Sequence, residues 1–145
     1  MNKTYFLLFA LVCANQAIAK DFDYRNVAMA GTGSVGDLFI RYLLPLNESC
    51  LLIQNLVPGK LGEVSAQKEI CSLDGKKIDS DFAAVDLKEG VFKGGRLFFE
   101  IGVTPFEPVG ETIMSCEVIF SHELADHLFC KKKENSKEDW RTCSS

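Results

Sequence analysis

The chain has 145 residues, of which 47% are hydrophobic, and a formal net charge of −4 at pH 7. A nucleic-acid-binding protein normally carries a basic stripe, so this acidic balance argues against that class of partner. It also provides no general attraction to anionic membrane surfaces.

Residues 1–19 have the pattern of a secretory signal peptide. Lys3 lies near the start, an apolar run covers residues 5–14, and residues 17–19 spell an A-x-A cleavage site. The apolar run is about half of the roughly 20 residues that a membrane-spanning helix needs, and no other stretch is long enough. We therefore predict no membrane span, cleavage after Ala19, and a secreted or periplasmic protein.

A lipoprotein signal with Cys13 as the lipidated residue is the alternative. Val12 precedes this cysteine, whereas a lipobox has glycine, alanine or serine at that position, so cleavage after Ala19 is preferred. We expect a single domain over residues 20–132, followed by a flexible polar tail over residues 133–145. The tail also holds the single tryptophan, Trp140.

Residues 31–36, GTGSVG, fit the G-x-G-x-x-G pattern of dinucleotide-binding proteins. That function needs a long helix after the last glycine and an acidic residue about 20 positions further on. Here Pro45 would end a helix over residues 37–44 after little more than two turns, and Gln54 or Asn55 occupies the acidic position. We predict no nucleotide and no other cofactor, and interpret the motif as a flexible turn between strands at 22–30 and 37–44.

The rest of the chain up to the tail alternates strand patterns with turn signals. The further predicted strands are 50–57, 63–71, 81–87, 96–103, 112–121 and 126–132. Between them we expect turns that include Asp74-Gly75 and a longer one over 89–95. In the strand at 112–121, apolar residues alternate with the others, which indicates one buried face; they are Met114, Cys116, Val118 and Phe120.

Short strands with turn signals every 8–12 residues are typical of two packed sheets or a barrel. The sequence therefore predicts an all-β fold, a small antiparallel β-sandwich. An immunoglobulin-like sandwich is the first choice, although the buried tryptophan typical of that fold is missing. A small barrel is the alternative.

Five cysteines follow the predicted signal peptide, and an exported chain meets an oxidising compartment. Two pairs are each nearly equidistant from a predicted turn, so we predict the disulfides Cys50–Cys71 and Cys116–Cys130. An exchange of partners that links the two hairpins is the alternative. Cys143 is left over, as a free thiol or as the link in a disulfide-bonded dimer.

A metal site is suggested only by the spacing C-x5-H-x4-H-x2-C, formed by Cys116, His122, His127 and Cys130. Oxidised cysteines do not ligate metal as thiolates, and His122 would lie in the turn, away from the cysteines. We therefore predict no metal.

Catalytic motifs are not apparent in the sequence. A G-x-S-x-G nucleophile motif is missing. Two carboxylate pairs, Asp79 with Asp81 and Glu117 with Glu123, have no sugar-binding aromatic residues beside them in sequence and are expected to be solvated. We predict no catalytic residue.

The loop at residues 104–111, TPFEPVGE, is the predicted binding surface. Pro105 and Pro108 stiffen it, which lowers the entropy lost on binding, and Phe106 and Glu107 lie between them. The alternative is that Phe106 caps the end of the sandwich.

These features predict an exported, non-enzymatic binding protein that acts on a protein or glycan partner from a host or a competitor. A small secreted hydrolase or metal-dependent enzyme is one alternative, and a subunit of a surface assembly is another.

Overall fold

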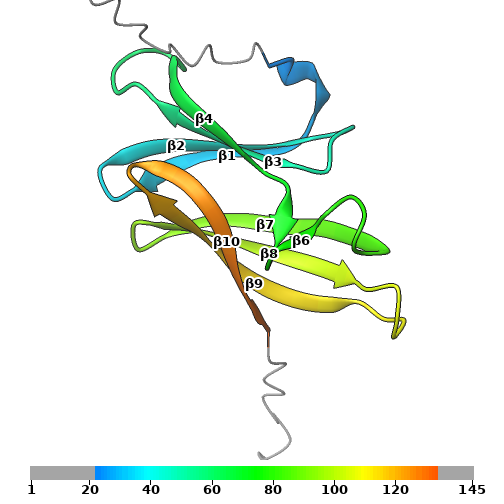
Figure 1. Cartoon of the computed structure of the whole chain (residues 1–145). Helices are drawn as coiled ribbons and strands as arrows, with labels where there is room; N and C mark the ends of the chain where they lie inside the picture. The colour runs from blue at the N-terminus through cyan, green and yellow to red at the C-terminus, as the bar shows by residue number, and fades with distance from the viewer. Residues whose placement is uncertain (1–21, 134–145) are drawn as a thin grey trace, which may run out of the picture.

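The structure is a computed structural model that describes residues 22–133, and these form two four-stranded antiparallel sheets stacked face to face (Figure 1). The elements are η1 Tyr24–Asn26, β1 Val27–Val35, β2 Leu38–Pro45, β3 Leu51–Leu56, β4 Val64–Ile70, β5 Ser72–Leu73, β6 Lys76–Lys77, β7 Ala84–Lys93, β8 Arg96–Thr104, β9 Thr112–Ser121 and β10 Leu124–Lys132. The predicted all-β, antiparallel, two-sheet fold is confirmed. The predictions for the signal peptide, Cys143 and residues 134–145 of the tail lie outside the described residues.

Each sheet is a meander of consecutive strands, in the orders β1-β2-β3-β4 and β10-β9-β8-β7, and β5 pairs with β6 as a separate small hairpin. In an immunoglobulin domain, by contrast, Greek-key connections pass the chain between the two sheets. The finer immunoglobulin-like topology is therefore not the one observed. Within residues 22–133 the two sheets share no hydrogen-bonded pair of strands, so the alternative of a closed barrel is wrong.

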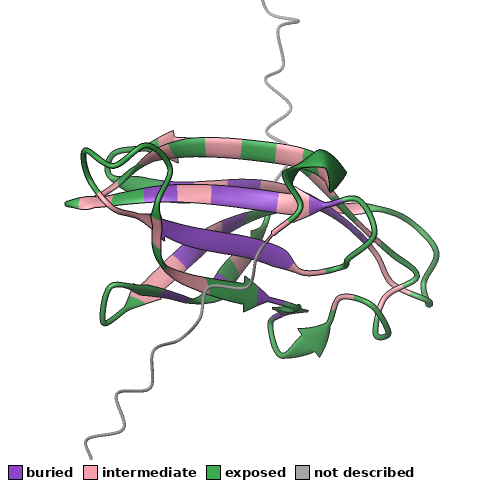
Figure 2. Cartoon of the chain, turned by 90° about the horizontal axis from the view of Figure 1, so that it is seen from above, coloured by how far each residue is buried: buried purple, intermediate pink, exposed green. Residues whose placement is uncertain are grey.

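The core lies between the sheets, where β1 packs against β7 and β4 against β10. Buried residues lie mostly along the strands, where they alternate with more exposed ones, and the connections are mostly exposed (Figure 2). The buried core residues are Ile40, Tyr42, Leu51, Ile53, Ile70, Leu73, Leu97, Phe99, Ile101, Val103, Cys116, Val118, Ala125 and Leu128. The predicted apolar face of β9 is confirmed, since Cys116 and Val118 are buried and its other two members pack against them.

The glycine-rich motif is part of a strand, and the predicted flexible turn is wrong. Gly31 and Gly33 lie inside β1, and only Gly36 and its successor form the turn to β2. A Cβ on Gly31 would lie 2.5 Å from a ring atom of Tyr42, and a Cβ on Gly33 would overlap the ring of Phe92. These glycines are needed because aromatic rings pack directly on the backbone of β1.

The predicted turn at 89–95 is also wrong, because most of these residues belong to a strand. Strand β7 continues to Lys93, and Gly94 and Gly95 alone make the turn. Gly90 lies inside the strand, where a Cβ would lie 2.6 Å from the Tyr42 ring and 2.7 Å from the Phe99 ring.

The first predicted strand also starts later than expected, at Val27. The segment before it forms the 3₁₀ turn η1, in which the side chain of Asp23 accepts a hydrogen bond from the backbone N–H of Arg25. Such a local side-chain hydrogen bond competes with the backbone hydrogen bonds of a sheet, so these residues do not extend the strand. The Arg41 guanidinium then donates to the Tyr24 hydroxyl at 2.7 Å and holds this segment beside β2.

Both predicted disulfides are confirmed. Cys50–Cys71 closes the open end of the β3–β4 hairpin, and its Cα atoms are 4.3 Å apart. Cys116 and Cys130 are directly opposed in the register of β9 and β10, with Cα atoms 4.0 Å apart. Each disulfide therefore links the two arms of its own hairpin, and the alternative with exchanged partners is wrong.

Each edge strand of the two four-stranded sheets carries a β-bulge. The register of each edge strand skips one residue relative to its inner neighbour; these residues are Ala28 in β1, Ser65 in β4, Lys88 in β7 and Asp126 in β10. Bulges interrupt the row of free N–H and C=O groups that would otherwise pair with another chain.

The turn between β9 and β10 is made of His122 and Glu123, whose φ angles are +50° and +66°. Two-residue hairpin turns of this kind favour Asn-Gly, because both central residues need a positive φ. Asn55 donates from its Nδ2 to the carbonyl oxygen of Glu123 at 2.6 Å, so a residue of the opposite sheet secures this conformation.

We expect Glu123→Gly to raise the free energy of unfolding by about 1 kcal/mol, because glycine adopts a positive φ without the Cβ clash. The measurement is urea denaturation under non-reducing conditions. Glu123→Ala is the matched control, since it also removes the carboxylate but keeps the Cβ. Equal effects of the two substitutions would contradict a backbone origin.

Candidate functional site

A cavity of about 350 Å³ opens at one end of the sandwich, between the two sheets. Its inner walls come from both sheets and include Leu44 and Leu51 on one side and Ile101 and Leu128 on the other. The β2–β3 and β6–β7 connections border it, and Figure 1 shows them at the same end of the molecule as the β8–β9 loop. The cavity lies where the facing strands of the two sheets end and their connections begin.

The described residues that line the cavity are mostly apolar. Ile78 and Phe82 from the β6–β7 connection extend the apolar wall beyond the strands, and both side chains also pack against the core. The polar lining residues are Glu48, Ser49 and Asp79, all of them exposed. A set of mostly apolar lining residues with a few polar side chains is the usual composition of a ligand pocket.

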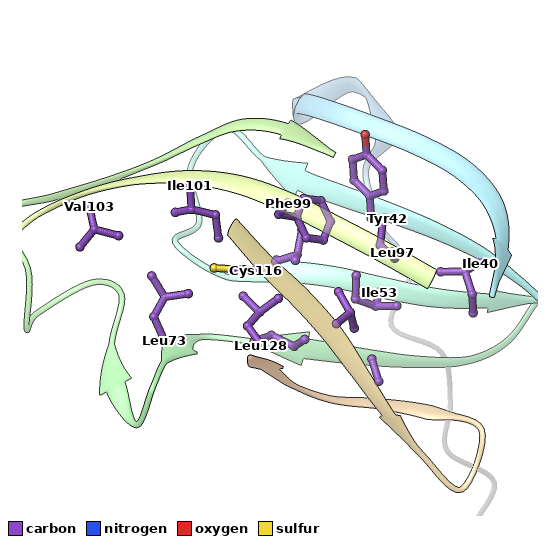
Figure 3. Close-up of a cluster of buried hydrophobic side chains, with 14 residues drawn as sticks. Ile40, Tyr42, Ile53, Leu73, Leu97, Phe99, Ile101, Val103, Cys116 and Leu128 are labelled. Atoms are coloured by element: carbon purple, nitrogen blue, oxygen red, sulfur yellow. The ribbon is translucent and has the colours of Figure 1, made fainter. Parts of the chain in front are cut away.

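The core beside the cavity is closely packed. Ile101, Val103 and Leu73 lie together near this end of the sheets, whereas Tyr42 and Phe99 pack against each other further along (Figure 3). The ring centroids of Tyr42 and Phe99 are 4.9 Å apart in an edge-on arrangement. Of these residues Ile101 also lines the cavity, so this part of the cavity wall is held by the packed core.

The predicted binding loop lies at the same end as the cavity. Its first residue, Thr104, accepts a hydrogen bond from the backbone N–H of Ala83, a cavity-lining residue, at 2.9 Å. Phe106 is 62% exposed and Val109 is 91% exposed, so Phe106 does not cap the core as the alternative proposed. Pro105 is half-buried. Binding by this loop stays a prediction.

The far end of the loop is held by an ion pair. Glu111 lies 2.8 Å from the ammonium group of Lys88, the bulge residue of β7, which also contacts Asp86 at 2.6 Å. These two carboxylates, Asp86 first, raise the pKa of Lys88 above its ordinary value. Gly102 leaves room for the pair, because a Cβ there would overlap the Glu111 carboxylate. The loop is therefore tied to the sheet at both ends.

The candidate metal ligands do not converge. Cys116 and Cys130 are bonded to each other, and His122 lies in the β9–β10 turn. His127 Nδ1 lies 3.0 Å from an oxygen of the adjacent Asp126. Across residues 22–133, no group of three or more His, Cys, Asp or Glu side chains is arranged to hold a metal.

The cavity was not predicted from the sequence. Two of its polar residues, Glu48 and Asp79, belong to separate connections, and nothing in either local sequence indicates that they border one cavity. Asp79 was expected to be solvated; it is exposed, but it also borders the cavity.

In the part of the chain that the structure describes, no helix is long and apolar enough to span a membrane. Neither a family model, nor a curated protein, nor a solved structure matches this chain.

Proposed function

We propose that the protein is an exported, non-enzymatic binding protein that takes its ligand at the end of the sandwich where the cavity opens. The cavity itself is the observation that carries this proposal. Its volume of about 350 Å³ falls in the range of small-molecule sites. The exposed loop with Phe106 and Glu107 stands at the same end and provides a second surface for a larger protein or glycan partner.

Export is supported by two independent features. Residues 1–19 have the pattern of a signal peptide, and the domain contains two disulfides. Disulfides persist in the periplasm and outside the cell, whereas the cytosol keeps thiols reduced. We therefore place the protein in the periplasm or in the medium.

Binding is better supported than the two alternative functions. The polar groups among the described lining residues are two carboxylates and one serine, Ser49, without a histidine or cysteine that would activate a nucleophile. For a surface assembly, the bulge on each edge strand of the two four-stranded sheets disfavours growth by strand addition.

A neutral apolar probe tests the cavity. We expect 4-phenylbutan-1-ol, with about eleven non-hydrogen atoms, to bind with a sub-millimolar dissociation constant. Binding should raise the melting temperature in a saturable way, because a ligand that binds only the folded state stabilises it. Chemical-shift mapping by NMR should place the probe among the cavity residues.

Val85→Trp is expected to abolish this binding, because Val85 lines the cavity and its larger replacement fills the space. Val91→Trp is the matched control: it lies on the same strand, is 40% exposed and does not line the cavity. Phe82→Ala, which removes part of the apolar wall, should weaken binding without overpacking. No saturable shift in the unmodified protein, or equal binding to Val85→Trp and Val91→Trp, would refute the proposal.

A further inference from the structure

We propose that the cavity selects cationic ligands, specifically a primary amine carried on an apolar body of roughly ten to fourteen non-hydrogen atoms. The inference rests on the proposed function, because it names the class of ligand that the same cavity takes. It is carried by the size of the cavity and by the charges at its mouth.

The size of the ligand follows from the volume. A dry apolar cavity of about 150 Å³ accommodates benzene, which has six carbon atoms. The cavity here, about 350 Å³, is more than twice as large. A phenyl ring with a short alkyl chain therefore fits, with its apolar part against Leu51, Ile101 and Leu128.

The charge preference follows from Glu48 and Asp79. They border the cavity from two different connections, β2–β3 and β6–β7, and both carboxylates are exposed to solvent. Within residues 22–133 neither carboxylate forms an ion pair, whereas Asp86, Glu100 and Glu111 all do. No basic side chain is among the described lining residues.

One cation of the protein itself lies close to this region. The ammonium group of Lys76 is 5.9 Å from the centroid of the Phe82 ring, outside the cavity lining. This ammonium group therefore contacts the Phe82 ring without belonging to the described cavity lining. A bound carboxylate would be repelled by the carboxylates of Glu48 and Asp79, whereas a bound ammonium group would be attracted by them.

Three ligands of nearly the same size test the inference at pH 7: 4-phenylbutylamine, 4-phenylbutan-1-ol and 4-phenylbutyrate. We expect the amine to bind about fivefold to tenfold more tightly than the alcohol, since each exposed carboxylate adds a modest attraction. The acid should bind at least about tenfold more weakly than the amine, and the difference should shrink as salt is added.

The double variant Glu48→Gln/Asp79→Asn should bring the amine and the alcohol to about the same affinity, with the alcohol changed by no more than about twofold. Glu69→Gln/Asp74→Asn is the matched control, because it removes the same two charges from exposed residues that do not line the cavity. It should preserve the preference for the amine.

The outcomes separate the two proposals. If all three ligands bind equally, or the acid binds best, the charge selection is wrong and the cavity remains a binding site. If the control variant also loses the preference for the amine, the charge selection is likewise wrong, because the net charge of the protein would then be the cause. If none of the three binds, both the inference and the proposed function fail.

Discussion

Gly90→Val is expected to lower the free energy of unfolding by about 3 kcal/mol or more, and Gly90→Ala by about 1–3 kcal/mol. The reason is steric, because a Cβ at this position would lie 2.6 Å from the Tyr42 ring and 2.7 Å from the Phe99 ring. Both rings are buried, and the Tyr42 hydroxyl donates to the carbonyl oxygen of Gly90 at 3.2 Å, which holds the ring against the strand.

The sign of this effect is opposite to the one that strand propensity predicts. Valine is among the best residues for a β-strand and glycine among the worst, so a strand without ring contacts would gain stability from the substitution. Urea denaturation of the oxidised protein measures the change through the denaturant midpoint. An unchanged or higher midpoint would show that the rings are free to move away.

A double variant separates the clash from other effects of the substitution. In the background of Phe99→Leu, which removes one of the two rings, Gly90→Ala should cost less than it does alone. The cost of the pair is then smaller than the sum of the single costs, as expected for residues in direct contact. Strict additivity would contradict the proposed contact between Gly90 and Phe99.

Loss of the Cys116–Cys130 disulfide is expected to cost about 2–5 kcal/mol, and to lower the melting temperature by about 10 °C or more. Cys116 is fully buried and Cys130 packs against the core, so Cys116→Ala/Cys130→Ala loses packing as well as the cross-link. The corresponding double variant of Cys50 and Cys71 should cost less, because Cys71 is exposed and lies at the end of its hairpin.

Partial reduction of the folded protein provides a second measurement of the same difference. A low concentration of dithiothreitol should open Cys50–Cys71 first, since thiol–disulfide exchange needs access to sulfur and Cys116 is buried. Peptide mapping after alkylation identifies the opened pair. Opening of Cys116–Cys130 first, or equal melting temperatures for the two double variants, would contradict this account.

Local patterns in the sequence determined the elements that depend on neighbouring residues alone. The alternation around Cys116 and Val118 predicted β9 with the same bounds that the structure has, because side chains of a strand alternate between two faces. Symmetry about turns predicted both disulfides, because residues opposed across a hairpin lie within bonding distance. The turn at Asp74 and Gly75 followed from their tolerance of positive φ.

The tertiary structure alone decided the role of the glycines and the position of the cavity. Gly33 and Gly90 resemble turn residues in sequence, but their strands need them because rings from other strands, Phe92 and Phe99, pack on their backbones. Glu48 and Asp79 have 30 residues between them and border one cavity only because the two sheets stack with their connections at one end. Such contacts depend on how the sheets are placed against each other, which no local pattern encodes.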